Sequence, residues 1–407
     1  MTHTFAADLT DPDLFVRGEH HSVFARLRQE DPVHWSGGPR GEGFWSLCRY
    51  ADVVSAYRDH VGFSSSAGAV LGGSFRNERD TAAGKMLVAS DLPRHRMLRQ
   101  VLYPAFSPTM VARVGQQVSA LVDQAVDRLV EDGGGDFATE VATALPAGAV
   151  MTMMNVGHAE AHELIGITRR MIGFRDPALV DIDDDERLRL AWLQSEVFEY
   201  FADLVKERRR DPGDDVVSML AHAEVNGRPM TGDEVLYNCM NVAVGGNETS
   251  SYTACTGLHA LLTNPDQYDR LLADPELLPS ALDEILRWSS TNAYVARLST
   301  RDIVIGGQEI GKGQLVALWN ASANFDDEHF VAPERFEITR SPNRHVTYGN
   351  GLHRCIGAPT ANAELSILYK ALLGRGVRLH LAGEVRRLRS NFILGMTSLP
   401  VRVVTAC

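Results

Sequence analysis

The sequence predicts a mainly α fold with small β-sheets (α+β), in which one large helical domain carries a β-rich N-terminal side. Helical patterns extend over residues 111–130, 192–210 and 231–263, and the last of these is unusually long for a globular helix. Short alternating runs separated by glycine turns, at residues 32–47 and 301–319, predict small β elements. Neither an internal repeat nor a linker interrupts the chain, so residues 1–407 are expected to form a single domain.

The remaining elements are predicted from the same signals. Two aromatic-bearing runs around a Gly-Gly-Pro turn predict a hairpin at residues 32–47, and a helix follows at residues 50–58. Residues 62–84 are rich in Gly and Ser, so they form either a solvent loop or a flexible wall over a pocket. We further expect helices at residues 145–168 and 277–288, an acidic break at residues 174–186, and a C-terminal hairpin at residues 388–404.

Composition and charge exclude several classes of protein. The chain is 44% hydrophobic and 23% charged, which is ordinary for a globular protein. Its net charge of -12 argues against nonspecific nucleic-acid binding. The five cysteines are scattered and form no C-x-x-C pair, which fits a reducing compartment. Since the N-terminus has no signal-peptide pattern and no apolar run approaches the length of a membrane span, we expect a cytoplasmic protein without a membrane partner.

The segment around Cys355 carries the most specific chemical signal. Gly349, Gly351 and Gly357 form a tight loop around the cysteine, and a helix is expected to begin near Pro359. Backbone N–H groups and the positive end of the helix dipole would favour a thiolate there. A lone thiolate in such a loop suits a soft metal bound from one side. The alternative for a single cysteine is a structural role in a turn.

Two pairs of polar residues have ordinary interpretations when taken alone. His95 and Arg99 lie four residues apart, so they share one helix face, which could simply be a solvated basic surface. Glu284 and Arg287 form an i,i+3 pair of a kind that is common on helix surfaces and contributes little to stability.

A glycine pair stands near the middle of the longest helical pattern, which Thr231 and Glu234 open with a capping box. Each glycine inside a helix costs about 1 kcal/mol relative to alanine, so the pair needs a reason. One reason is the close approach of another helix. The Glu-Thr pair two residues after the glycines favours a site instead. The residues concerned are Gly245, Gly246, Glu248 and Thr249.

Taken in their order along the chain, these segments resemble the cytochrome P-450 family over nearly the whole chain. The Gly-x-Gly-x-His-x-Cys-x-Gly loop is similar to the haem-ligand loop of the family, with Tyr348 where Phe is usual. By this resemblance Cys355 is the metal ligand, on the axial side of the iron of haem b, and its electron donation favours O–O cleavage. The resemblance implies these cofactor-binding residues: His95, Arg99, Gly245, Gly246, Arg297, Tyr348, Gly349, His353, Cys355 and Gly357.

The resemblance also gives roles to the two less specific segments. The glycine pair corresponds to the place where the family's long helix bulges over the iron and leaves room for dioxygen, although Gly245 stands where Ala is commoner. Glu284 and Arg287 match the family's Glu-x-x-Arg pair, and an Arg placed like Arg335 supplies the third member of a buried network behind the haem.

The function that the resemblance implies is a monooxygenase that activates dioxygen to hydroxylate a small organic substrate. Thr249 and Glu248 would be the catalytic residues, which supply protons. Electrons would come singly from a separate ferredoxin and ferredoxin reductase, fed by NAD(P)H, and Arg96, Arg344 and Arg354 would dock the donor. Oxidative coupling or ring formation uses the same motifs and stays an alternative. A non-catalytic haem sensor is a further alternative, against which the intact Glu-Thr pair argues.

The substrate itself is not encoded in a motif. The resemblance is to bacterial members that tailor natural products (secondary metabolites), whose substrates arrive free or tethered to a carrier protein. We expect Asn241 near the roof of the pocket, where either a neighbouring helix or water, or a polar group of the substrate, satisfies its amide. The expected substrate-pocket residues are Asn238, Asn241, Val242, Thr291, Asn292, Ile393 and Leu394.

Overall fold

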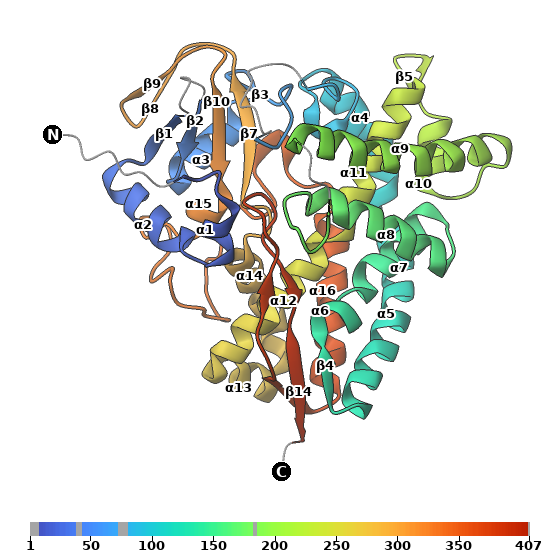
Figure 1. Cartoon of the computed structure of the whole chain (residues 1–407), viewed down its shortest axis with the longest axis vertical. Helices are drawn as coiled ribbons and strands as arrows, with labels where there is room; N and C mark the ends of the chain where they lie inside the picture. Colours follow the sequence, from blue (N-terminus) through green and yellow to red (C-terminus); the bar gives the residue numbers. More distant parts are fainter. Residues whose placement is uncertain (1–7, 38–42, 72–79, 182–184, 406–407) are drawn as a thin grey trace.

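The computed structural model describes residues 8–37, 43–71, 80–181 and 185–405, and the statements below concern these residues. Its longer helices occupy one side and the lower half of the molecule, and the largest sheet lies at the upper left in Figure 1. The mainly α fold with small β-sheets is therefore confirmed. The predicted helices at residues 50–58 and 277–288 correspond closely to α3 and α14. The helices are α1 (Pro12–Val16), α2 (His20–Glu30), α3 (Tyr50–Arg58), α4 (Arg94–Leu102), α5 (Pro108–Glu131), α6 (Phe137–Glu140), α7 (Ala144–Met154), α8 (His158–Ile172), α9 (Glu186–Arg210), α10 (Val216–Ala221), α11 (Gly232–Asn247), α12 (Thr249–Thr263), α13 (Pro265–Ala273), α14 (Leu278–Ser289), α15 (Asn320–Ala323) and α16 (Ala358–Gly374).

The largest sheet joins the N-terminal part of the chain to a segment about 250 residues later. Its strand order is β1-β2-β10-β7-β3, in which β10 runs parallel to β2 and the other neighbours are antiparallel. The predicted hairpin at residues 32–47 is confirmed as β1 and β2, and its turn lies outside the described residues. The strands are β1 (Val33–Gly37), β2 (Gly43–Leu47), β3 (Phe63–Ser64), β4 (Gly134–Asp136), β5 (Glu224–Val225), β6 (Arg228–Pro229), β7 (Tyr294–Ser299), β8 (Ile303–Ile305), β9 (Gln308–Ile310), β10 (Leu315–Trp319), β11 (Val377–Leu381), β12 (Arg386–Arg387), β13 (Met396–Ser398) and β14 (Pro400–Thr405).

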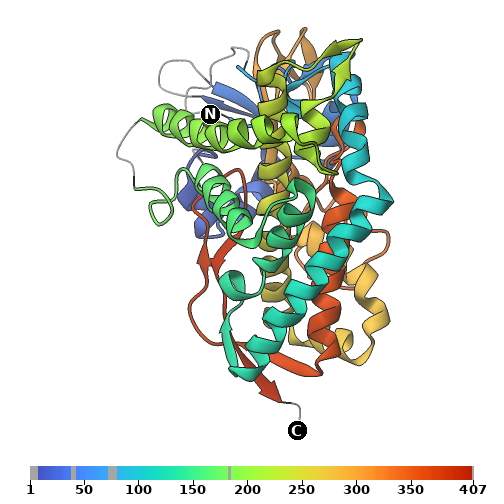
Figure 2. The ribbon, with the colours of Figure 1, turned by 90° about the vertical axis from the view of Figure 1, so that its right-hand side faces the viewer.

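The helical side is built on α5, which packs against α7 and α16. Ser107 caps the start of α5, and Pro108 stands in its first turn. A stripe of buried residues at four-residue spacing, including Val114, Val118 and Val122, then faces the neighbours. A side chain at Gly148 of α7 would come within 2.6 Å of Val118, so glycine is needed for this approach. Figure 2 shows α5 and α16 side by side, with α11 and α12 running through the centre.

Two predicted helices are each broken in the structure. The helix expected at residues 145–168 ends at Met154, because Asn155 adopts a left-handed conformation (φ 51°), and α8 begins after Gly157. The long pattern at residues 231–263 divides into α11 and α12 at Glu248. The capping box of Thr231 and Glu234 is confirmed.

Two further expectations are corrected. The C-terminal residues do not form one hairpin, because β13 pairs with β12, whereas β14 pairs with β11 and β4. The window Phe137–Met154 is long and apolar enough by length and composition to cross a membrane, so an apolar run of span length exists. It runs over α6 and α7, and 72% of it is buried inside the protein, which gives it a place in the core.

Candidate functional site

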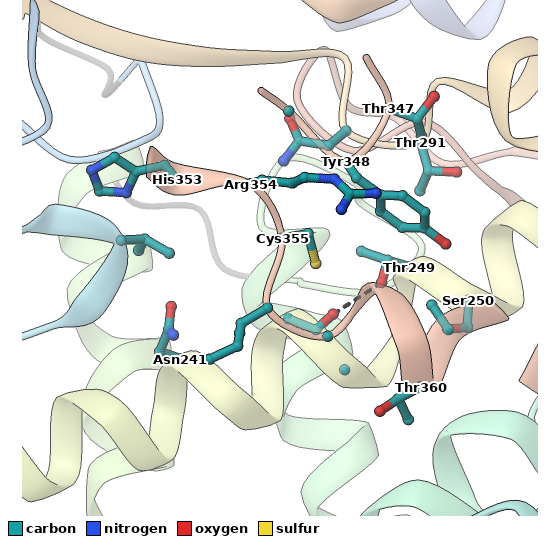
Figure 3. Close-up of a pocket in the computed structure, with 18 of the residues that line it drawn as sticks. Asn241, Thr249, Ser250, Thr291, Thr347, Tyr348, His353, Arg354, Cys355 and Thr360 are labelled. Carbon is teal, nitrogen blue, oxygen red and sulfur yellow. Dashed lines mark hydrogen bonds between the residues drawn. The ribbon is translucent and has the colours of Figure 1, made fainter. Parts of the chain in front are cut away.

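A cavity of about 300 Å³ opens where five parts of the chain converge. α11 and α12 form one wall, the loop before α16 forms the opposite wall, and residues of α4, α7 and β7 close the space between them. Figure 3 shows Cys355 and Thr249 facing this space from the two walls. The sequence motifs therefore meet at one cavity, although they lie up to about 260 residues apart in the chain.

The Cys355 loop has the geometry that the glycines predict. Gly349 and Gly351 adopt left-handed backbone conformations, with φ of 68° and 67°, which side chains rarely permit. The Cys355 N–H donates to the Tyr348 carbonyl at 2.9 Å and closes the loop. The helix that follows has its proline in the first turn, as expected. The sulfur of Cys355 is thereby presented to the cavity.

Opposing effects act on the protonation of Cys355. Burial raises the pKa of the thiol above its usual value. The backbone N–H groups of Gly357 and Ala358 and the charges of Arg99 and Arg354 act in the opposite direction without outweighing burial. The helix start thus acts in favour of the thiolate, as predicted. A cation bound to the sulfur would supply the missing stabilisation, because a coordinating thiol is deprotonated by its metal.

Four basic side chains gather on one side of the cavity: His95, Arg99, Arg297 and His353. His95 is fully buried, and neither of its ring nitrogens has a hydrogen-bond partner among the described residues. Burial together with the positive charge of Arg99 lowers the pKa of His95 to about 4. Burial and the charge of Arg297 lower the pKa of His353 to about 2.

Carboxylate partners for these basic groups are missing from the described part of the chain. Arg99 and Arg297 form no salt bridge there, and the Arg297 guanidinium, which is 5% exposed, donates to the Ala296 carbonyl at 2.8 Å. A buried cation without a partner is costly, so the cluster is suited to an anionic group of a bound molecule.

The break between α11 and α12 provides open space above the cysteine. A side chain at Gly245 or Gly246 would meet no atom of the described residues within 4 Å, so close approach of another of these helices does not explain the glycine pair. The Thr249 hydroxyl donates to the Gly245 carbonyl at 2.9 Å (Figure 3). Because its proton is engaged there, the lone pairs of the Thr249 oxygen remain available to accept a hydrogen bond from the cavity.

Glu248, which the sequence pairs with Thr249, is turned away from the cavity. Its side chain is fully buried, and its carboxylate accepts a hydrogen bond from the Arg169 guanidinium of α8 at 3.0 Å. Burial raises the pKa of Glu248, and the charge of Arg169 opposes this effect. The cavity lining includes Gly246 and Thr249 but not the residues between them.

The expected substrate-pocket residues divide into two groups. Asn241, Val242, Thr291 and Asn292 line the cavity. Asn238, Ile393 and Leu394 do not, and these three expectations are corrected.

Each of the three excluded residues has an identifiable role elsewhere. The Asn238 amide is satisfied by the N–H of Leu87 and by the carbonyls of Lys85 and Glu234, as a buried amide requires. Ile393 pairs through its backbone with Asn292 and is buried behind it. Leu394 lines a separate cavity.

The network expected around Glu284 has a different third member. Glu284 and Arg287 are fully buried and paired at 2.8 Å, so they are not a surface pair. The third side chain is that of Arg340, which lies 3.1 Å from the Glu284 carboxylate. Arg335 is exposed and contributes its backbone carbonyl, which accepts from both Arg287 and Arg340. The prediction that the Arg335 side chain completes the network is wrong.

Glu364 is a cavity residue that sequence reasoning missed. Burial raises its pKa to about 8, although a hydrogen bond with Ser250 acts in the opposite direction. It lies on α16 with Thr360, Ala361 and Leu365, which also line the cavity. These four positions share one face of the helix that follows the cysteine. An acidic residue on that otherwise apolar face was the available signal.

The residues present fit a haem. The cysteine sulfur faces open space below two glycines that no side chain crowds. The basic cluster beside it, which has no carboxylate partner among the described residues, matches the two carboxylates that haem carries. Cys355 would hold the iron, and His95, Arg99, Arg297 and His353 would hold the carboxylates.

Comparison with known proteins decides the identity of this site. A family model described as Cytochrome P450 matches residues 13–377. The chain belongs to the cytochrome P450 family. Linalool 8-monooxygenase of Pseudomonas putida is 32% identical over 407 residues, which cover 98% of each protein. Cytochrome P450 NovI of Streptomyces niveus is 34% identical over 399 residues, which cover 97% of this chain and 96% of NovI.

Solved P450 structures share the fold. Mycobacterium marinum cytochrome P450 CYP268A2, in complex with pseudoionone, superposes with a TM-score of 0.88 at 31% identity and 98% coverage of both chains. P450 OxyD, involved in the biosynthesis of vancomycin-type antibiotics, gives a TM-score of 0.87 at 32% identity, covering 98% of this chain and 100% of OxyD. The chain is thus a P450 monooxygenase, an oxidoreductase with haem as its cofactor.

Proposed function

We propose that this P450 hydroxylates a small, mainly apolar organic molecule that carries one polar group, as a tailoring step in natural-product biosynthesis. A separate ferredoxin and its NAD(P)H-dependent reductase supply the electrons, in the cytoplasm. The observation that carries the proposal is the distribution of polar atoms in the cavity wall. Leu87, Val88, Val242 and Val295 provide apolar surface.

Two amides interrupt that apolar surface. The side-chain oxygen of Asn292 is buried without a hydrogen-bond partner among the described residues. Asn241 also lines the cavity, and its side chain makes no hydrogen bond within the described chain. An unpaired buried polar group costs about 1–3 kcal/mol. A substrate hydroxyl that donates to the Asn292 oxygen would recover this energy, and a hydrogen bond with the half-buried Asn241 amide would help to fix which C–H bond faces the iron.

The names of the relatives support both parts of this proposal. Linalool 8-monooxygenase and the steroid C26-monooxygenase of Rhodococcus jostii are named for oxygenation of one carbon of a largely apolar molecule. OxyD and the cytochrome P450 PksS of the bacillaene polyketide synthase support a place in natural-product biosynthesis.

The roles of the chain's own residues follow from their positions. Haem, held by Cys355, supplies the activation of dioxygen by electrons that arrive one at a time. The Thr249 oxygen accepts a hydrogen bond from the cavity and so holds a proton where dioxygen is reduced. Glu248 is the proton source, and its carboxylate lies next to Arg169. Burial raises the pKa of this carboxyl group. The apolar wall keeps bulk water out of the cavity. The water molecules of the proton path are the exception.

A spectroscopic screen tests the proposal. Terpenoids, aromatic amino-acid derivatives and polyketide fragments, each with and without one hydroxyl or carbonyl group, are titrated into the holoenzyme. Binding near the iron is read from the spin-state change of the haem spectrum, and products are identified by mass spectrometry. We expect hydroxyl- or carbonyl-bearing members to bind at least tenfold more tightly than their unsubstituted analogues, and the product to contain one added oxygen atom.

Asn241→Leu provides the matched variant for this screen. It should incorporate haem normally but lose the preference for the polar group, or oxidise the same compound at several carbons. Wild-type selectivity in Asn241→Leu would assign Asn241 to packing. A product that lacks two hydrogens and gains no oxygen would replace hydroxylation by oxidative coupling.

A further inference from the structure

A second cavity, of about 370 Å³, lies on the other side of the substrate-cavity wall. It is enclosed by the start of α2, the preceding turn, α12, the end of α14 and the loop after β12, which meet near the middle of Figure 1. It shares no lining residue with the haem cavity. Nothing in the P450 reaction requires it.

The polar lining of this cavity consists of hydrogen-bond donors and basic groups. Two arginines and three histidines line it, and the described residues contribute no acidic side chain to the lining. This is unusual for a chain of net charge -12. The basic lining residues are Arg17, His20, His21, His259 and Arg387.

His20 is the strongest indication that a ligand belongs here. The side chain is 5% exposed. A backbone contact with Leu14 acts on its pKa as a weak hydrogen bond would, but neither ring nitrogen has a hydrogen-bond partner of good geometry among the described residues. Buried polar atoms in native proteins are nearly always paired, so such an orphan needs an explanation. One face of the ring stacks on Phe15 at 4.8 Å between centroids, and the His21 ring lies 4.1 Å from it. The ring is therefore held in place at the cavity.

Besides burial, the positive charge of Arg387 lowers the pKa of all three histidines that line this cavity. Burial and, after it, the charge of Arg387 lower the pKa of His21 to about 4 and also lower the pKa of His259. Arg387 acts on His20 in the same direction, after burial and His21. Within the described chain Arg387 forms no salt bridge, and its guanidinium donates to the Val16 carbonyl. Arg17, in contrast, pairs with Glu19 at 2.9 Å.

Four hydroxyl side chains and several apolar side chains complete the lining; the hydroxyl residues are Thr256, Thr263, Ser289 and Ser290. The apolar part of the lining consists of Phe15, Trp288, Leu388, Leu394 and Met396, of which Phe15 also stacks on His20. A ligand that satisfies both parts needs an anionic group next to Arg387 and the histidines, and a hydrocarbon body against the apolar side chains. The volume is within the range of sites for small organic molecules.

We propose that this second cavity binds a small organic anion, with a carboxylate or phosphate group held by Arg387, His20 and His259 and an apolar body packed against Trp288 and Leu394. The site is separate from the substrate cavity but adjacent to it. The N–H of Leu394 donates to the carbonyl of Thr291 at 2.7 Å, and the Thr291 side chain lines the haem cavity. One layer of chain thus separates the two ligands.

Calorimetric titration of the holoenzyme with octanoate tests the site directly. The haem cavity is first saturated with 4-phenylimidazole, which ligates haem iron, so that remaining octanoate binding reports on another site. We expect one octanoate per chain in the blocked enzyme, and much weaker binding of neutral octanol and of inorganic phosphate. Arg387→Gln should weaken octanoate binding at least tenfold, and His259→Phe, which keeps an aromatic ring but removes the donors, should weaken it severalfold.

Arg386→Gln is the matched control, since Arg386 is exposed like its neighbour Arg387 but does not line the cavity. It should bind octanoate as the wild type does. Loss of octanoate binding on saturation with 4-phenylimidazole would overturn the proposal, and so would equal affinities of the wild type and Arg387→Gln. Equal affinity for octanoate and inorganic phosphate would overturn the assignment of an apolar body. An unchanged haem spectrum of each variant confirms that the P450 site is intact.

Discussion

Several residues that line the haem cavity lie where the protein disfavours their charged forms. A bound group that carries both positive and negative charge would offset this effect. Burial raises the pKa of Cys355 and lowers those of His95 and Arg297, so the protein environment alone disfavours the charged form of each. A cation at the sulfur and carboxylates at the basic side chains reverse both effects together. Haem would supply the two charges at the required sites, which explains why the described residues offer these groups no partner of opposite charge.

Thr249 provides a prediction about proton delivery. Thr249→Ala removes the oxygen whose lone pairs face the cavity and leaves the Gly245 carbonyl without its donor. The variant should still bind haem and dioxygen, but more of the reducing equivalents should end in hydrogen peroxide, and product per NAD(P)H consumed should fall about tenfold or more. Oxygen uptake, peroxide and product are measured on the same sample. An unchanged ratio of product to reductant would mean that protons take another route.

Glu364 provides a prediction about stability and pH. Its pKa of about 8 in the folded protein lies above the ordinary value of 4.5, so between these values the folded protein holds a proton that the unfolded chain releases. The free energy of unfolding therefore decreases as pH rises through this interval. Glu364→Gln removes this contribution, and its Tm should fall less than that of the wild type between about pH 5 and about pH 8.

The exposed Glu131, at the end of α5, offers a control for the same experiment. Glu131→Gln should follow the wild-type dependence of Tm on pH. If Glu364→Gln and the wild type lose Tm in parallel across this range, Glu364 does not hold the extra proton.

Sequence reasoning identified which residues belong to the site better than it identified where their side chains point. Cys355, His95 and Arg99 were assigned to the site through the resemblance of their segments to the family, and all three line the cavity. Helical spacing adds that His95 and Arg99 share one helix face. Arg335 and Arg340 lie in an irregular segment, where no period relates sequence position to direction, so the wrong arginine was chosen. Asn238 shares a helix face with Asn241, but a neighbouring loop reaches its amide first.

At the scale of elements, the sequence predicted helices well and their interruptions less well. The pattern at residues 231–263 continues through Glu248, because periodicity records which face is buried and not whether the backbone stays helical. The break at Asn155 has the same origin, since a single left-handed residue leaves the apolar pattern on both sides intact. Pairing of the C-terminal strands could not be predicted, because β14 finds its partners far away in the sequence.

The network that ties α14 to the segment before the cysteine loop gives the prediction at this scale. Arg340 donates to the buried Glu284 carboxylate and to the carbonyls of Val331 and Ala332. Arg340→Gln should lower the free energy of unfolding by about 1–3 kcal/mol, since hydrogen bonds to a buried charge are lost while Arg287 remains. Chemical denaturation of the holoprotein measures the difference.

Arg335→Gln is the control, because its exposed side chain contributes only the backbone carbonyl, which the substitution retains. Its free energy of unfolding should stay within about 0.5 kcal/mol of the wild type. A greater loss in Arg335→Gln than in Arg340→Gln would restore the assignment made from sequence alone.

At the scale of the whole molecule, the net charge of -12 is opposed locally by exposed arginines near the cysteine loop. Arg96 on α4 and Arg344 ahead of the loop are both exposed. We expect this basic surface to receive an acidic ferredoxin, because local charge complementarity steers association even when both proteins are acidic overall. Arg344→Glu should raise the apparent KM for ferredoxin severalfold and weaken its dependence on salt, with kcat at saturating ferredoxin unchanged.

Arg209→Glu, in the last turn of α9, makes the same charge change at an exposed position far from the cysteine loop in the sequence. If net charge alone governed association, both variants would raise the apparent KM equally, and both effects would fade together as salt screens charges beyond about 10 Å. If docking is local, only Arg344→Glu changes the slope of KM against salt. Steady-state kinetics with ferredoxin at several ionic strengths separate the two cases. An unchanged slope in Arg344→Glu would move the electron donor to another face of the protein.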